Sequence, residues 1–166
     1  MSTQENAVSA GLAGKYMTFK LASEEYGLEI LKVRELIGLL EITRVPKTPH
    51  FIRGVINLRG KVIPVLDLRL KFGLPPVASN SQTVIIVVQI AGRGNSATMG
   101  VLVDEVLEVR AIAAPDIEPA ASLQGQLDAE FILGVGKVEK RVLFLLDIDR
   151  ILNPQEKRAV GEALAT

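Results

Sequence analysis

Short hydrophobic runs alternate with polar turns along most of this chain, a pattern that predicts β-strands and disfavours a fold of long helices. The polar turn at 22–25 and the turn at Gly60 each join two such runs, as expected of hairpins. A glycine at the second turn permits the positive φ that tight hairpins need. The expected strands cover residues 16–21, 26–30, 54–58, 61–66, 83–90, 98–103, 106–110, 132–138 and 141–146.

The clearest helix signal lies at the C-terminal end, over residues 153–166. Asn153 is placed to cap the first turn of this helix, and Pro154 suits its first helical position. Asp67 and Asp147 each follow a strand and precede a short turn, where a carboxylate caps exposed backbone amides. Their matched surroundings favour two structural caps over a pair of catalytic carboxylates.

The chain also repeats itself. Residues 51–70 align without a gap to residues 131–150, at a constant shift of 80 positions. A weaker similarity links residues 26–36 with residues 99–109. Self-similarity of this kind indicates a structural duplication. The identical pairs of the main alignment are Phe51/Phe131, Ile52/Ile132, Gly54/Gly134, Val55/Val135, Val62/Val142, Leu66/Leu146 and Asp67/Asp147.

Many short strands separated by regular turns are typical of small barrels. A unit of about 60 residues buries too little of its surface to be stable alone, so two units should share a core. The sequence therefore predicts an all-β protein of two small β-barrels packed on a common hydrophobic seam, with short helices. The first barrel is expected mainly in residues 15–80 and the second mainly in 83–150.

The composition of the chain limits the classes of function that fit it. The chain has 166 residues, 48% of them hydrophobic and 4% aromatic, with no cysteine and zero formal net charge. Without cysteine it has no disulfide, thiolate zinc site or cysteine nucleophile. His50 stands alone beside a proline and is interpreted as a loop residue. An enzyme is therefore disfavoured and no cofactor or metal is expected, which leaves a binding module.

Two further classes of protein are disfavoured. A small-barrel nucleic-acid binder stays a distant alternative, because such proteins usually display stacking aromatics and a basic groove. The longest apolar run, 83–90, is too short to span a bilayer, so no direct membrane insertion is expected. Residues 1–14 lack the apolar core of a signal peptide and are expected to form a flexible tail.

Candidate contact residues lie where the two copies differ. The first hairpin tip carries Asn57, Leu58 and Arg59, whereas the matched positions of the second tip lie in a charged run, 137–140, interpreted as solvated. Arginine suits an interface because its planar fork makes two aligned hydrogen bonds and also lies on apolar surface. Two interpretations of Arg59 stay open, a partner contact or a turn residue paired with a carboxylate.

The segment 28–40 poses a similar choice. Most of its aliphatic residues are expected in the core, but Val33 alternates with charged neighbours and either packs inside or meets a partner. Glu35 is either a solvated charge or a polar contact.

Residues 25–36 and 43–73, the latter with the pattern GV-x-NLRG-x-x-x-P-V-x-DLR, closely resemble the CheW family of bacterial chemotaxis coupling proteins. The resemblance extends over residues 15–152. It implies two SH3-like five-stranded barrels and an adaptor without catalysis of its own. Such an adaptor couples the cytoplasmic tips of chemoreceptors to the regulatory domain of the histidine kinase CheA.

By motif position, the resemblance implies that Asn57, Leu58, Arg59 and Glu35 bind the receptor tip. Val33 would contact CheA or border the receptor site. A second-barrel surface would touch another CheA or CheW copy, without particular residues assigned. The expected location is cytoplasmic, at the inner face of the membrane through receptor arrays. A CheW-like coupler of another pathway, such as surface motility, is the main alternative.

Overall fold

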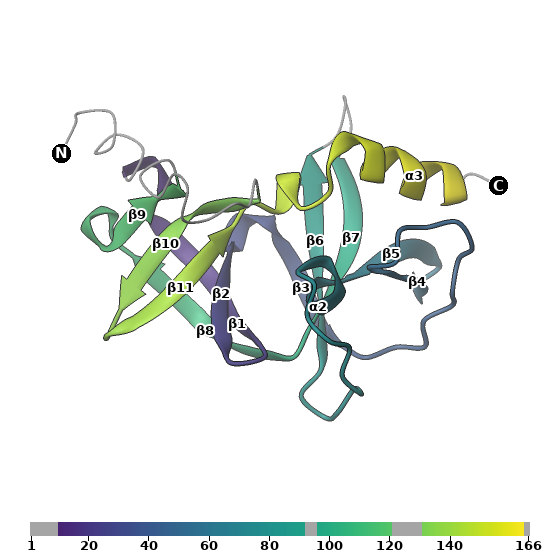
Figure 1. Ribbon diagram of the computed structural model, residues 1–166, viewed down its shortest axis with the longest axis horizontal. Coiled ribbons are helices and arrows are strands. Elements are labelled where there is room, and N and C mark those ends of the chain that lie inside the picture. Colours follow the sequence, from purple (N-terminus) through teal and green to yellow (C-terminus); the bar gives the residue numbers. More distant parts are fainter. Residues whose placement is uncertain (1–9, 92–95, 121–130, 165–166) are drawn as a thin grey trace.

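The computed structural model describes residues 10–91, 96–120 and 131–164, which form two β-sheets with short helical segments (Figure 1). The strands are β1 (Gly14–Leu21), β2 (Glu24–Glu29), β3 (Val33–Gly38), β4 (Ile52–Leu58), β5 (Lys61–Asp67), β6 (Val84–Ala91), β7 (Ser96–Val103), β8 (Glu105–Ile112), β9 (Ile117–Pro119), β10 (Ile132–Val138) and β11 (Arg141–Leu146). The helical segments are η1 (Ile30–Lys32), α2 (Leu68–Lys71), η2 (Ala114–Asp116), η4 (Ile148–Arg150) and α3 (Pro154–Leu164).

The two sheets stand side by side. Sheet A has the strand order β8-β1-β2-β11-β10-β9, and sheet B has the order β3-β6-β7-β5-β4. Neighbouring strands are antiparallel except for β2 with β11 and β5 with β7, which run parallel. The all-β architecture and the hairpins expected from the sequence are confirmed.

The duplication is visible in this order of strands. Each sheet contains the same arrangement when β6, β7, β3, β5 and β4 of sheet B are matched with β1, β2, β8, β11 and β10 of sheet A. The hairpins β1–β2 and β6–β7 are therefore exchanged between the two halves. The barrel boundaries expected from the repeat, 15–80 and 83–150, do not coincide with the sheets, because pairing between distant strands decides which hairpin joins which sheet.

The two sheets also differ in number of strands. Sheet A has a sixth strand, β9, which pairs with β10. At the matched place sheet B has an isolated bridge between Thr43 and Val55, with N–H···O distances of 2.8 Å in both directions. The expectation of five strands in each barrel thus holds for sheet B, and sheet A exceeds it. Residues 10–12 form a helical turn before β1, and residues 1–9 of the expected tail lie outside the described residues.

Three hydrophobic clusters hold these sheets. The largest contains residues of both sheets, among them Phe19, Leu28 and Val101, and forms the expected common seam. One smaller cluster lies within sheet B and another within sheet A. Strand β6 is buried on both faces: Ile85 and Val87 belong to the cluster of sheet B, whereas neighbouring side chains belong to the seam. This explains why its sequence is apolar without alternation.

The local caps are where the sequence predicts them. Asp67 accepts a hydrogen bond from the backbone N–H of Arg69 at 2.9 Å, and Asp147 accepts one from Asp149 at 3.1 Å. The Asn153 side chain accepts from the backbone N–H of Glu156 at 2.7 Å, and the Glu156 carboxylate accepts from the backbone N–H of Asn153 at 2.8 Å. This reciprocal pair is a capping box at the start of α3. In the described part of the chain, no helix has the length and apolarity to cross a membrane.

Candidate functional site

The first hairpin tip is a tight turn between β4 and β5. Arg59 and Gly60 both have positive φ, 52° and 88°, as the favoured two-residue hairpin turns require. The Asn57 side-chain oxygen accepts a hydrogen bond from the backbone N–H of Gly60 at 2.8 Å, which fixes the turn. Leu58 is half-buried and packs against the cluster of sheet B. The tip is therefore a rigid platform that presents Arg59.

The Arg59 guanidinium lies against the carboxylate of Glu35. The two hydrogen bonds between them, from Nη1 to Oε1 and from Nη2 to Oε2, measure 2.8 and 2.5 Å. Because β3 and β4 are the outermost strands of sheet B, this pair joins the two ends of the sheet. The hydrogen bond from Arg59 holds the pKa of the Glu35 carboxyl below its usual value. Of the two interpretations left open for Arg59, the structure shows the pairing with a carboxylate, and 70% of the arginine side chain remains exposed.

Val33 lies on the same strand as Glu35, beyond an irregularity in the pairing of β3 with β6. It is half-buried and packs against the seam cluster. Of the expected contact residues, the fold thus gathers Asn57, Leu58, Arg59 and Glu35 in one place. Val33 lies where sheet B meets the seam.

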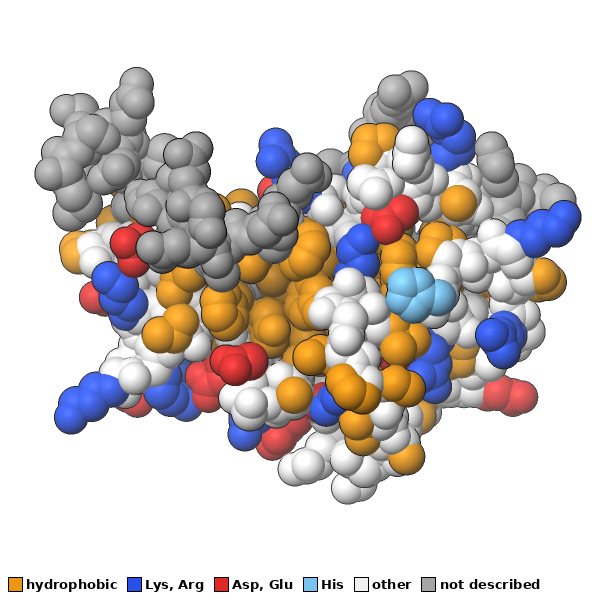
Figure 2. All heavy atoms as spheres, in the orientation of Figure 1, with side chains coloured by type: hydrophobic (Ala, Val, Ile, Leu, Met, Phe, Trp, Pro, Cys, Tyr) orange, Lys and Arg blue, Asp and Glu red, His pale blue; other side chains and the backbone are white. Residues whose placement is uncertain are grey.

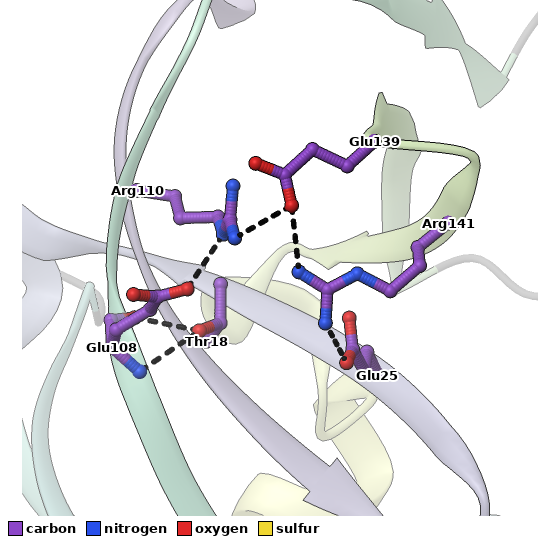
Figure 3. A network of polar contacts seen from close by, with 6 residues as sticks. All are labelled: Thr18, Glu25, Glu108, Arg110, Glu139 and Arg141. Carbon is purple, nitrogen blue, oxygen red and sulfur yellow. Dashed lines mark hydrogen bonds and ion pairs between the residues drawn. The ribbon is translucent and has the colours of Figure 1, made fainter.

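The second hairpin tip is exposed, as its charged sequence suggests, and Glu139 also makes ion pairs there. Figure 3 shows the Glu139 carboxylate between two arginines, Arg110 at 3.4 Å and Arg141 at 3.7 Å. Arg110 also pairs with Glu108 at 2.8 Å, and Arg141 with Glu25 at 2.8 Å. At this tip the turn residue is the anion and its partners are cations, the reverse of Arg59 with Glu35. The sequence carried a signal for it, since Arg59 and Glu139 are matched positions of the repeat.

A bulge in the pairing of β1 with β8 lies next to this network. The Thr18 hydroxyl donates to the backbone oxygen of Glu108 at 2.6 Å and accepts from its backbone N–H at 3.1 Å. Both bonds satisfy backbone groups that the bulge removes from the sheet ladder. Thr18 is thereby a buried polar residue with its hydrogen bonds made, as Figure 3 shows.

Aromatic residues gather at the seam, which sequence reasoning missed. Tyr26 packs against Phe19, Phe72 and Phe144 with ring centroids 5.4–5.7 Å apart. Phe72 in turn stacks on Phe131 at 5.0 Å. Figure 2 shows hydrophobic side chains reaching the surface in the middle of this face, between the two sheets. Phe72, at the end of α2 beside sheet B, thereby packs against Tyr26 of sheet A.

No group of three or more His, Asp or Glu side chains in the described part of the chain is arranged to hold a metal ion. His50 is an exposed loop residue whose ring lies 5.4 Å from that of Phe51, as its sequence context suggests.

Comparisons with known proteins agree on one family. The family model of the CheW-like domain matches residues 15–156. A chemotaxis protein CheW of Klebsiella aerogenes is 36% identical over 160 residues, which covers 96% of this chain and 94% of the relative. A chemotaxis protein CheW of Helicobacter pylori is 35% identical and covers 83% of this chain and 81% of its own. The crystal structure of the scaffolding protein TtCheW from Thermoanaerobacter tengcongensis superposes with a TM-score of 0.76 at 35% identity, over 87% of this chain and 96% of that one.

Proposed function

The chain belongs to the family of CheW-like domains, and on that premise we propose that it couples chemoreceptors to the histidine kinase CheA in chemotaxis. The observation that carries this proposal is the match of nearly the whole chain in sequence to a chemotaxis protein CheW, together with the match in fold to a scaffolding protein. The adaptor binds its partners and catalyses no reaction itself. The relatives named above are chemotaxis proteins, which favours this pathway over surface motility.

The receptor tip binds at the first hairpin tip of the adaptor. A guanidinium has five N–H donors, and Glu35 takes one from each terminal nitrogen of Arg59, so further donors face outward. The bidentate pair also holds the guanidinium in one orientation before the partner arrives, which reduces the entropy lost on binding. Asn57 and Leu58 flank this cation and complete the contact surface.

The kinase regulatory domain binds near Val33, at the border of sheet B and the seam. Further copies of the adaptor or kinase bind on sheet A and extend the array. Each contact can be modest, because linked contacts gain from a high effective concentration. The adaptor thus sits in the cytoplasm at the inner face of the membrane, held there by receptors.

The substitution Arg59→Glu tests the receptor contact. It places a carboxylate beside Glu35, so we expect receptor-fragment affinity to fall at least about tenfold while CheA affinity stays unchanged. Lys61→Glu is the matched control, since Lys61 is an exposed cation of the same hairpin and undergoes the same change of charge. The measurement is isothermal titration calorimetry against a receptor cytoplasmic fragment and the CheA regulatory domain.

Exchanging the charges of Arg59 and Glu35 distinguishes a partner contact from an ion pair that only supports the fold. The double variant Glu35→Arg with Arg59→Glu restores an ion pair across the sheet but presents the opposite charge to the partner. We expect receptor binding to stay weak in this variant. Recovery of wild-type affinity would show that the pair only supports the fold, and the proposed receptor surface would then be wrong.

A further inference from the structure

Arg69 ends the DLR part of the family-like motif, yet it does not lie among the residues assigned to docking. Its side chain is only 14% exposed. It donates two hydrogen bonds to Asp104, from Nε to Oδ1 at 2.7 Å and from Nη2 to Oδ2 at 2.6 Å. A third bond runs from Nη1 to the backbone oxygen of Pro75 at 3.2 Å. A nearly buried arginine with this many bonds is held in one conformation.

Asp104 lies where the chain passes from β7 of sheet B to β8 of sheet A. Its Oδ2 also accepts a hydrogen bond from the backbone N–H of Ala22 at 2.8 Å, in the turn between β1 and β2 of sheet A. Its own backbone N–H donates to the backbone oxygen of Lys20 at 3.2 Å. One carboxylate therefore ties α2, which packs against sheet B, to a hairpin of sheet A.

The chain also passes from one sheet to the other between β2 and β3, and an ion pair forms at this second crossing too. The chain passes from β2 of sheet A to β3 of sheet B through η1, where Lys32 donates to Asp149 of η4 at 2.8 Å. Asp149 follows Arg69 by the same 80 positions as the other repeat matches. In each repeat, the helical segment after the second hairpin thus binds a crossing between the sheets, with the charges reversed. The recurrence argues that the contact belongs to the architecture and not to chance surface pairing.

The attraction between apolar side chains across the seam is non-directional, so there the angle between the sheets depends only on how the side chains pack. A bidentate ion pair is directional, because both hydrogen bonds must align at once. We propose that Arg69 and Asp104 are positioning residues that hold sheets A and B in one relative orientation. Lys32 and Asp149 do the same, more weakly, at the other crossing, where both side chains are more exposed than Arg69.

The proposed role of the Arg69–Asp104 pair in holding the sheets does not depend on the proposed function. Only its consequence for signalling rests on that function. An adaptor that joins a receptor at one surface to a kinase at another transmits a displacement only if the two surfaces keep a fixed relation. We therefore expect loss of the Arg69–Asp104 pair to lower kinase activation more than it lowers either binding affinity.

The orientation itself can be measured on the isolated full chain. The protein has no cysteine, so Val62→Cys on sheet B and Val142→Cys on sheet A, at exposed valines, provide two specific spin-label sites. Double electron–electron resonance then gives the distribution of distances between the sheets. We expect Arg69→Met and Asp104→Asn to broaden this distribution about twofold relative to the doubly labelled parent. Arg110→Met is the matched control, because this arginine is also mostly buried but its partners Glu108 and Glu139 both belong to sheet A.

Two results would overturn the proposal. One is a distribution that stays as narrow as the parent's in both variants, or that broadens equally in the Arg110→Met control. The other is loss of the folded far-UV circular dichroism spectrum in both variants, since the pair would then be required for folding and not for orientation. Neither result depends on receptor or kinase, so a failure of the proposed function is recognised separately, by the absence of binding in the parent protein.

Discussion

Arg59 and Glu139 occupy matched positions at the two hairpin tips and carry opposite charges. Each contacts a residue of the opposite sign on a matched strand, Glu35 on β3 and Arg110 on β8. The ion pairs at the two tips thus have opposite polarity, although Arg110 lies two positions after Glu108, the residue matched with Glu35. The first tip therefore presents an exposed cation, whereas Glu139 of the second tip lies between two arginines.

Single glycines show how closely the chain segments approach. A Cβ on Gly54 would lie 2.1 Å from the backbone oxygen of Thr43, and the φ of Gly54 is +146°. Gly134 is in the same position in sheet A, 2.6 Å from the backbone oxygen of Glu118. Both glycines thus permit the bridge or strand that lies beside β4 or β10.

We therefore expect Gly54→Ala to lower the free energy of unfolding by at least about 3 kcal/mol, because backbone must move to admit the methyl group. Gly38→Ala is the control, since a Cβ there meets no atom within 4 Å. It should change stability by less than about 0.5 kcal/mol. Urea titration monitored by circular dichroism measures both, and equal effects would contradict the steric explanation.

Residue-level features were predictable where their cause is local. Asp67 and Asn153 bond backbone groups two or three residues away, so the sequence alone predicts their caps. The identity of the carboxylate that pairs with Arg59 was not predictable, because Glu35 reaches it only after sheet B has closed. The network around Glu139 escaped prediction for the same reason.

At the scale of elements, hairpins were predicted well and their pairing was not. Each hairpin is specified by its own turn, as Gly60 illustrates for β4–β5. The exchange of β1–β2 and β6–β7 between the halves depends on the parallel pairs β2–β11 and β5–β7, which join distant parts of the chain. A repeat in the sequence reveals that two similar units exist, but it does not reveal which strands each unit donates to the other.

The C-terminal helix provides the test at this scale. Glu156 belongs both to the capping box of α3 and to a mostly buried pair with Lys71 of α2, whose Nζ lies 2.9 Å from each carboxylate oxygen. Asn153→Ala removes the side-chain acceptor that begins the box and should cost about 1 kcal/mol in thermal or urea unfolding. Gln155→Ala, at an exposed position of the same first turn, serves as control and should be nearly neutral. A larger loss in the control than in the cap variant would refute the capping role.

At the scale of the whole molecule, a shared seam and two polar ties join the sheets. The seam cluster includes Ile151, Leu152 and Val160 from the C-terminal part of the chain, so α3 reinforces it from beside sheet B, as Figure 1 shows. Sequence reasoning predicted the seam, because units this small need a common core. It did not predict the ties, because Arg69 and Asp104 are distant in sequence and lie in unlike contexts.

We expect low pH to weaken the contacts of Asp104 and so to lower the free energy of unfolding. Burial raises the pKa of the Asp104 carboxyl, but hydrogen bonds from Arg69 and from the Ala22 amide outweigh it and hold the pKa below the usual 3.8. A group with a depressed folded-state pKa stabilises the fold above its unfolded-state pKa and loses that contribution as the pH falls through the folded-state value. We expect the unfolding free energy of the parent to decline more steeply below pH 3.8 than that of Asp104→Asn. Parallel declines in urea titrations across this range would contradict the assignment.

The proposed function requires one small rigid protein to hold a receptor and a kinase at the same time. Sedimentation velocity on a mixture of this chain, a receptor cytoplasmic fragment and the CheA regulatory domain tests it directly. We expect a single faster species that contains all three, and its loss when Arg59→Glu replaces the parent chain. Competition between receptor fragment and kinase domain, with only binary complexes at every ratio, would contradict it.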